Sequence, residues 1–353
     1  MDFGQDEIAL AISGLAGDVL RKECDPAAGY DERAWAALAK AGLLALPLPA
    51  DLDGDGLGIA EAAALLTEVG RHAAGVPALA TLALGALTVA EHGTAGQRDA
   101  LLPGVGAGTA LLTAALSEPG SPLPEAPATR ATPGWSLTGT KTAVLHATRA
   151  DRVLVTATTP DGIGVFLLDP HAEGVTIAAT PTSTGAPEHT LTLAAAPAEL
   201  LGTDTTGATA DALRANGVAG ALALGSGALA GALELTTEHL RTRHQFGKPL
   251  ATFQAVAQQI AEVYVAARTV ELSATSAVWR LATGRDAAED IDIAAYWLTT
   301  EAPSALRTCH HLHGGIGVDV TYPLHRYYAT LKDIARFLGG AGHRLDTLAA
   351  KER

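Results

Sequence analysis

The chain of 353 residues is long enough for two or three packed layers or small domains around a substantial core. Its net charge of −14, with no basic block, excludes the clustered cationic face that nucleic-acid binding requires. Apolar residues make up 48% of the chain but aromatic residues only 4%, so the core must consist largely of Ala, Leu and Val, which favours closely packed helices.

Residues 1–110 are predicted to form an N-terminal helical domain. Apolar residues recur at helical spacing in EIALAISGLAGDVL from Glu7 and in ERAWAALAKAGLLAL from Glu32. Pro26, Pro47 and Pro103 interrupt this pattern and predict turns.

One segment of this domain comes close to a calcium-binding loop. In DLDGDGLGIAEA, the first, third, fifth and sixth positions are Asp51, Asp53, Asp55 and Gly56. The twelfth position, which must supply a bidentate glutamate, is Ala62. A solvated turn between two helices is therefore the favoured interpretation, and no metal site is expected.

Residues 111–202 are predicted to form a small antiparallel β-domain. Short apolar runs separated by Pro, Gly and Asp clusters are typical of a small sheet or barrel. The runs are GTALLTAAL, WSLTGTKTAVL, RVLVTAT, IGVFLLD, VTIAA and HTLTLA.

Residues 203–353 are predicted to form a four-helix bundle, with long helices at about 206–243, 250–283 and 286–312 and two shorter helices after Tyr322. The uncharged stretch from Ala215 to Leu233 has the length of a membrane span. Because Ala and Gly insert weakly into lipid, it is interpreted as a buried helix. Helices, then strands, then helices give an α+β class with three domains.

A segment between the first two long helices of the bundle, RHQFGKPLATFQ, brings together Arg243, Phe246, Gly247 and Gln254. An arginine fork suits a diphosphate, a phenylalanine can pack on a ring system, and a glutamine can bind the edge of a heterocycle. Cations at a helix end also complement the helix dipole, so ordinary charge placement is the alternative.

A second segment, HHLHGGIG from His310, is rich in histidine and glycine. Its histidines lack paired-ligand spacing with an acidic partner, so no metal is expected there. Gly314 and Gly315 lack a side chain that would block the close approach of a ligand to the backbone.

These two segments and LSEPGS from Leu116 resemble, in order and spacing, the characteristic segments of the acyl-CoA dehydrogenase family. The resemblance covers nearly the whole chain. It implies FAD as cofactor, bound mainly by a neighbouring subunit. The residues implied to contact FAD are Arg243, Phe246, Gly247, Gln254, Gly314, Gly315 and Ser117, together with His311, which stands where the family usually carries glutamine.

The same resemblance implies that the catalytic base is missing. The family's reaction removes the α-proton of an acyl thioester, which requires a carboxylate. Gly339 or Gly340 occupies the place of this acid, and Gly217 occupies its alternative place on the long helix before the Phe246 segment; only a register error of a few residues would recruit Asp211. At the flavin-facing positions of the β-domain, Ala143 and Leu145 replace the family's tryptophan and threonine.

This pattern implies a subunit of a heteromeric (α2β2) acyl-CoA dehydrogenase that completes the FAD site of a homologous catalytic partner. Bulky acyl-CoA substrates such as steroid side-chain thioesters, and an electron-transfer flavoprotein, are the other expected partners. Two alternatives remain open: a self-sufficient homotetrameric dehydrogenase with an unconventional base, and a binding or scaffold protein that has lost FAD.

The two cysteines, Cys24 and Cys309, lie far apart and neither belongs to a CxxC motif. This pattern predicts a reducing compartment. Since the N-terminal residues also lack a signal-peptide layout, a cytoplasmic protein with no membrane or nucleic-acid partner is expected.

Overall fold

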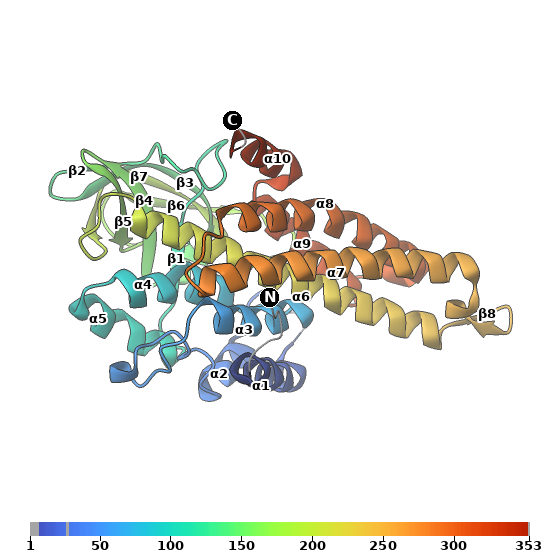
Figure 1. Cartoon of the computed structure of the whole chain (residues 1–353). Helices are drawn as coiled ribbons and strands as arrows, with labels where there is room; N and C mark the ends of the chain where they lie inside the picture. Colours follow the sequence, from blue (N-terminus) through green and yellow to red (C-terminus); the bar gives the residue numbers. More distant parts are fainter. Residues whose placement is uncertain (1–6, 26–27, 352–353) are drawn as a thin grey trace.

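The computed structural model describes residues 7–25 and 28–351 and has three parts that follow one another along the chain (Figure 1). The N-terminal helices lie beneath the β-domain and the near half of the C-terminal bundle. The rest of the bundle extends away from both. The helical N- and C-terminal parts and the β-domain between them confirm the predicted α+β class.

The N-terminal part is helical as predicted. Asp31 caps α2 by accepting a hydrogen bond from the backbone N–H of Ala34 at 2.9 Å. The turn predicted at Pro26 lies outside the described residues. The turn predicted at Pro103 is wrong, because this proline lies inside α5 (Ala95–Gly106). It falls in the last turn, where the missing N–H removes a single helical bond. The helices are α1 (Glu7–Glu23), α2 (Glu32–Lys40), η1 (Ala50–Leu52), α3 (Ile59–Arg71), the π-helix η2 (Leu79–Ala86), α4 (Leu87–His92) and α5 (Ala95–Gly106).

The β-domain is a barrel-like sheet with the order β1-β4-β2-β3-β7-β5, and β5 pairs back with β4. The strands are β1 (Leu112–Ala115), β2 (Arg130–Thr132), β3 (Ser136–Leu145), β4 (Arg152–Thr159), β5 (Gly162–Leu168), β6 (Val175–Thr180) and β7 (Glu188–Leu200), and η3 (Ala147–Arg149) follows β3. The prediction of a purely antiparallel sheet is wrong in part, because β4 pairs in parallel with β1 and β2. The strand β2 was not predicted, because its three residues are too few to show an alternating pattern.

The C-terminal bundle is organised around one helix of 35 residues, α6 (Ala208–Thr242). It packs on α3, α7 (Gln254–Ala282), α8 (Ala288–His313) and α9 (Leu324–Phe337), and α10 (Gly340–Lys351) completes the chain. Although α6 is long and apolar enough to cross a membrane, 72% of its most apolar window is buried in the protein, as predicted for a core helix.

Small residues allow α6 to lie against α3 at close range. A Cβ atom added to Gly70 of α3 would overlap the backbone of Leu224, and one added to Gly227 of α6 would overlap the backbone of Thr67. Glycine is therefore required at both positions by the approach of the two backbones.

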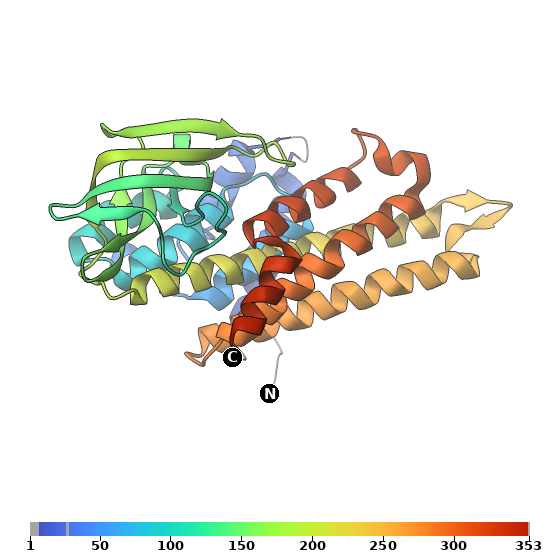
Figure 2. The same cartoon turned by 90° about the horizontal axis from the view of Figure 1, so that it is seen from above.

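A cluster of polar contacts ties α9 to the segment between β6 and β7. The Asp333 carboxylate accepts hydrogen bonds at 2.9 Å from the backbone N–H groups of Ser183 and Thr184. One turn further along α9, Arg336 donates two hydrogen bonds, of 2.9 and 2.5 Å, to the buried carboxylate of Glu188. These charge-assisted contacts hold the β-domain against the bundle. Figure 2 shows the β-domain and the bundle side by side, seen from above.

Candidate cofactor site

The first predicted cofactor segment forms the tip of the bundle. After Arg243 ends α6, the strands β8 (His244–Gln245) and β9 (Lys248–Pro249) pair through a two-residue turn, which projects from the end remote from the β-domain (Figure 1). Both turn residues have left-handed backbones, with φ of +52° at Phe246 and +78° at Gly247. This is the conformation that a tight hairpin requires.

The tip is cationic and open. No Asp or Glu occurs between His239 and Phe253, whereas Arg241, Arg243 and Lys248 lie in that interval. In the described part of the chain, the Arg243 guanidinium has no hydrogen-bond or ion-pair partner. The Phe246 side chain is 92% exposed, although burying such a ring is favourable. An unpaired guanidinium beside an exposed ring suits an anionic ligand with an aromatic part.

Gln254 begins α7 directly after the short helix η4 (Leu250–Thr252), and its side chain is exposed. The structure therefore brings Arg243, Phe246, Gly247 and Gln254 to one end of the bundle, as their spacing predicts.

The second predicted segment lies at the same end. The α6 residue His239 stacks on the α8 residue His313, with ring centroids 4.4 Å apart. After His313, α8 gives way to the 3-10 helix η5 (Gly314–Val318). Gly314 has a φ of +62°, and Cβ atoms added to Gly314 or Gly315 would meet no atom within 4 Å. The backbone of this turn is open to a ligand, and the His311 side chain beside it is exposed.

Ser117 is not part of this cluster. It lies in the β-domain, it is 7% exposed, and its hydroxyl oxygen accepts a long hydrogen bond of 3.4 Å from the backbone N–H of Leu123. The predicted cofactor residues of one chain therefore occupy two separate places.

The three glycines at the predicted base positions differ in their surroundings. A side chain at Gly217 would overlap Leu84, and one at Gly339 would overlap His343 and crowd Pro122. Gly340, with a φ of +79°, has open space beside it. Asp211 is exposed and forms a 2.8 Å ion pair with Arg214 in the first turn of α6. Of the glycines, Gly340 alone leaves room for a reactant or a longer side chain.

The two altered positions on β3 lie beside a change in strand register. The pairing of β3 with β7 shifts between Lys141 and Val144, and Ala143 has a φ of +55°. Both Ala143 and Leu145 are half-buried.

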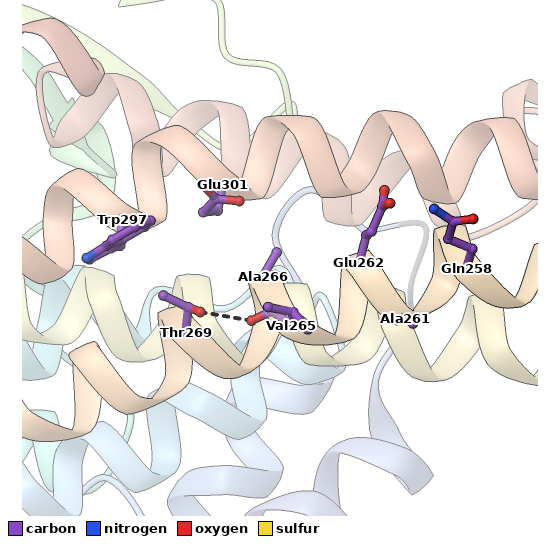
Figure 3. Close-up of a pocket in the computed structure, with 8 residues that line it drawn as sticks. All are labelled: Gln258, Ala261, Glu262, Val265, Ala266, Thr269, Trp297 and Glu301. Carbon is purple, nitrogen blue, oxygen red and sulfur yellow. Dashed lines mark hydrogen bonds between the residues drawn. The ribbon is translucent and has the colours of Figure 1, made fainter.

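A groove of about 510 Å³ between α7 and α8 was not anticipated from the sequence (Figure 3). Trp297 and Glu301 of α8 face Val265, Thr269 and the carboxylate of Glu262 on α7. Nearby on α7, the large side chains of Tyr264 and Val265 are 59% and 62% exposed. The groove therefore combines exposed apolar side chains with the carboxylates of Glu262 and Glu301.

Among residues 7–25 and 28–351, no group of three His, Cys, Asp or Glu side chains is arranged to hold a metal ion. Asp53, in the segment that resembles a calcium loop, has a left-handed backbone after η1.

The helical, β and helical parts follow one another in the order that the sequence resemblance implies, and the basic tip and the glycine turn lie at one end of the bundle. Residues 6–109 match the acyl-CoA dehydrogenase N-terminal domain, and residues 210–351 match the acyl-CoA dehydrogenase C-terminal domain. The chain therefore belongs to the acyl-CoA dehydrogenase family, an FAD-dependent family of oxidoreductases.

Two relatives from Mycobacterium tuberculosis match over almost their full length. The chain is 47% identical to acyl-CoA dehydrogenase FadE28, with 99% of each chain covered. It is 33% identical to acyl-CoA dehydrogenase FadE27, with 98% of this chain and 97% of the relative covered.

Two solved structures have the same fold, each with a TM-score of 0.90. One is a variant of the Tcur3481-Tcur3483 steroid ACAD, at 39% identity, with 98% of this chain and 97% of the other covered. The second is the ChsE4-ChsE5 complex from Mycobacterium tuberculosis, at 32% identity, with 99% and 98% covered.

Proposed function

We propose that this chain is a subunit of a heteromeric, FAD-dependent acyl-CoA dehydrogenase and that it gives FAD-binding and interface residues to a homologous catalytic partner. One contrast carries the proposal. The residues suited to a nucleotide are present and open at the tip, whereas glycine stands at each position where a base is expected.

The tip residues fit the adenosine diphosphate end of FAD. Arg243 would hold the diphosphate, Phe246 would pack on a ring, and Gln254 and His311 would donate hydrogen bonds. Gly314 and Gly315 would let the backbone approach the ligand. Because Ser117 and the tip lie apart, we assign the tip to a flavin held mainly by the partner subunit. When bound, FAD accepts the β-hydrogen of the acyl chain as hydride.

Abstraction of the α-proton must then come from the partner. A carboxylate at the α-carbon contributes about 10² to 10⁴ in rate. Gly217 is enclosed by Leu84, and Asp211 is an exposed residue engaged by Arg214. A glycine at position 339 or 340 has no group that can accept a proton.

The groove between α7 and α8 supports a partner subunit at this surface. Large apolar side chains that stay exposed along two helices of a water-soluble fold are typical of an interface. Trp297 is a suitable anchor for such an interface because aromatic side chains dominate binding energy. Glu262 and Glu301 beside it would select a partner with basic side chains.

The substrate class is inferred by similarity to the Tcur3481-Tcur3483 steroid ACAD and the ChsE4-ChsE5 complex. We infer that the substrate is the CoA thioester of a bulky steroid side chain. We also infer an electron-transfer flavoprotein as the electron acceptor, and a cytoplasmic location. A self-sufficient homotetramer and a flavin-free scaffold are the competing functions.

Counting FAD per chain separates these three functions. The chain should be purified alone and after co-expression with homologous dehydrogenase subunits, and its flavin absorbance, mass and acyl-CoA dehydrogenation should be measured. We expect little flavin and negligible turnover from the chain alone, and fewer flavins than chains in an active complex. Stoichiometric flavin with turnover from this chain alone contradicts the proposal, and so does a colourless complex.

A further inference from the structure

Two histidines of the HHLHGGIG segment hold the glycine turn in place. The Nδ1 atom of His310 lies 2.7 Å from the carbonyl oxygen of Gly317, across η5. Because a carbonyl can only accept, this nitrogen must carry a hydrogen and donate it. The His310 ring is also packed at 89° to the ring of Tyr328 in α9, with centroids 5.5 Å apart.

His313 is the buried member of the pair, with 5% of its surface exposed. Its Nδ1 atom donates to the carbonyl oxygen of Cys309 at 2.8 Å. Its Nε2 atom lies 3.1 Å from the hydroxyl of Tyr322, in the segment that leads into α9. With Nδ1 protonated, the neutral ring accepts a hydrogen bond from Tyr322 at Nε2. One ring thus joins the end of α8 to the start of α9.

The same ring also joins α8 to α6, through its stack on His239. His239 lies four residues before Arg243, which is one turn of helix. The glycine turn and the guanidinium at the tip are therefore connected through two imidazole rings and one helical turn.

We propose that His310 and His313 are positioning residues that fix the Gly314–Gly317 turn relative to Arg243, so that both bind one nucleotide diphosphate. Neither side chain needs to touch the ligand. The inference rests on the proposed function, because the ligand of the turn is the FAD assigned above.

The surroundings of His313 make this arrangement sensitive to acid. The groups that face it are His239 on α6, His310 on its own helix and Tyr322 before α9, and Arg243 lies next to His239. Burial lowers the pKa of His313, the hydrogen bond to the Cys309 carbonyl opposes this shift, and His239 and His310 add to the lowering. Protonation would remove the acceptor for Tyr322 and put a cation against the His239 ring. The turn should therefore loosen as the pH falls below the usual range of histidine.

The test uses the assembled complex and two readouts: the rate of FAD dissociation, and hydrogen exchange of the amides in residues 314–318. His310→Phe keeps a ring against Tyr328 but cannot donate to Gly317. His310→Asn restores a donor close to the position of Nδ1. Arg243→Ala reports whether the tip binds FAD at all, and His171→Gln is a control in an exposed part of the β-domain.

We expect His310→Phe to speed both FAD dissociation and amide exchange about two- to tenfold, the range for one lost hydrogen bond. His310→Asn and His171→Gln should stay close to wild type. His313→Gln, which keeps an acceptor but does not titrate, should make FAD dissociation less dependent on pH below about 6.5, the ordinary pKa of histidine.

The inference is overturned if His310→Phe leaves FAD dissociation unchanged while Arg243→Ala speeds it. If none of the variants, including Arg243→Ala, changes FAD dissociation, the proposed function is wrong and the inference fails with it. Faster amide exchange in His310→Phe would then show that the histidine orders the turn for a purely structural reason.

Discussion

The Lys141 ammonium lies 2.8 Å from the carboxylate of Glu118, and the two side chains are only 0% and 5% exposed. Thr156 also accepts a hydrogen bond from Lys141, and Thr129 donates both its N–H and its hydroxyl to Glu118. Burial alone would raise the pKa of Glu118, but the hydrogen bonds from Lys141 and Thr129 outweigh it and hold that pKa at about 2. Burial lowers the pKa of Lys141 to about 8 despite the neighbouring Glu118, so both partners are charged inside the β-domain at neutral pH.

Removing one partner should destabilise the chain strongly. Lys141→Met leaves the Glu118 charge buried without its counter-ion, and we expect a loss of about 3 to 5 kcal/mol in the free energy of unfolding by urea. The double variant Lys141→Met/Glu118→Leu should recover much of this loss, because no uncompensated charge remains. A single variant as stable as wild type would show that the pair is unimportant.

Arg243→Ala should lower the FAD content of the assembled complex without changing its preference among acyl-CoA substrates. A guanidinium bonded to a diphosphate contributes about 1.5 to 3 kcal/mol, which corresponds to about ten- to a hundredfold in affinity. Arg243→Lys should rescue poorly, since a point charge cannot replace the fork.

The matched control for Arg243 is Arg241→Ala, which removes the same charge from the same turn of α6. Flavin titration of both complexes checks the prediction. Equal losses in the two variants would mean that the tip acts only through its net charge.

Introducing an acid at the three glycines should give three different outcomes. Gly340→Glu has open space and should cost only about 1 kcal/mol, mainly from the positive φ. Gly339→Glu must displace His343, and Gly217→Glu would bury a carboxylate against Leu84 and should cost several kcal/mol. The melting temperatures of the three variants give the order of these costs in stability.

Acyl-CoA-dependent flavin bleaching, measured with the partner's own base removed, shows whether Gly340→Glu creates a working base. We expect no bleaching, because Ala143 and Leu145 stand where the family resemblance implies a tryptophan and a threonine facing the flavin. Bleaching by this variant would show that the chain keeps a usable flavin site of its own.

Acid should destabilise the chain through His146. This ring is buried, its Nδ1 atom has no partner among the described residues, and burial, then Arg149 and His189, lower its pKa to about 4. The unfolded chain takes up a proton below about pH 6.5, whereas the folded chain keeps the ring neutral down to about pH 4. Stability should fall with decreasing pH in this window, by at most about 1.4 kcal/mol per pH unit for one proton.

His146→Asn is the variant that checks this assignment, because asparagine tolerates the left-handed backbone at this position, where φ is +52°. The pH dependence of the urea midpoint should be shallower in this variant between about pH 4 and 6.5. An unchanged slope would assign the acid sensitivity to other buried histidines.

The succession of helical, β and helical parts could be predicted because the sequence patterns that define each part involve neighbouring residues. The uncharged run of small apolar residues in α6 and the turn residues of the hairpin are both recognisable from neighbouring residues. The parallel pairing of β1 with β4 could not be predicted, since a strand of four residues carries no signal for its direction. The helical Pro103 shows the same limit, because tolerance of a proline depends on how soon the helix ends.

Within the candidate site, the residue types of the tip were predictable but their accessibility was not. The overlap of Gly217 with Leu84 arises from packing between α6 and η2, two elements more than a hundred residues apart. The groove beside Trp297 depends on the angle and separation between α7 and α8, which the periodicity of the sequence does not determine. The roles proposed for His310 and His313 could not be predicted, because they depend on where Gly317 and Tyr322 lie in space, beyond the next turn of the chain.

The uninterrupted α6 gives this chain a mechanical property. At 1.5 Å per residue its 35 residues form a rod of about 52 Å that starts beside the β-domain and ends at the hairpin. The close contact of Gly231 with Arg71, the last residue of α3, is a pivot about 18 Å from Arg243. A tilt of about 3° about this point would move Arg243 by about 1 Å, enough to stretch a hydrogen bond beyond its working length. A change at the β-domain end of α6 would therefore be transmitted, as leverage, to the tip that we propose binds the flavin of a partner subunit.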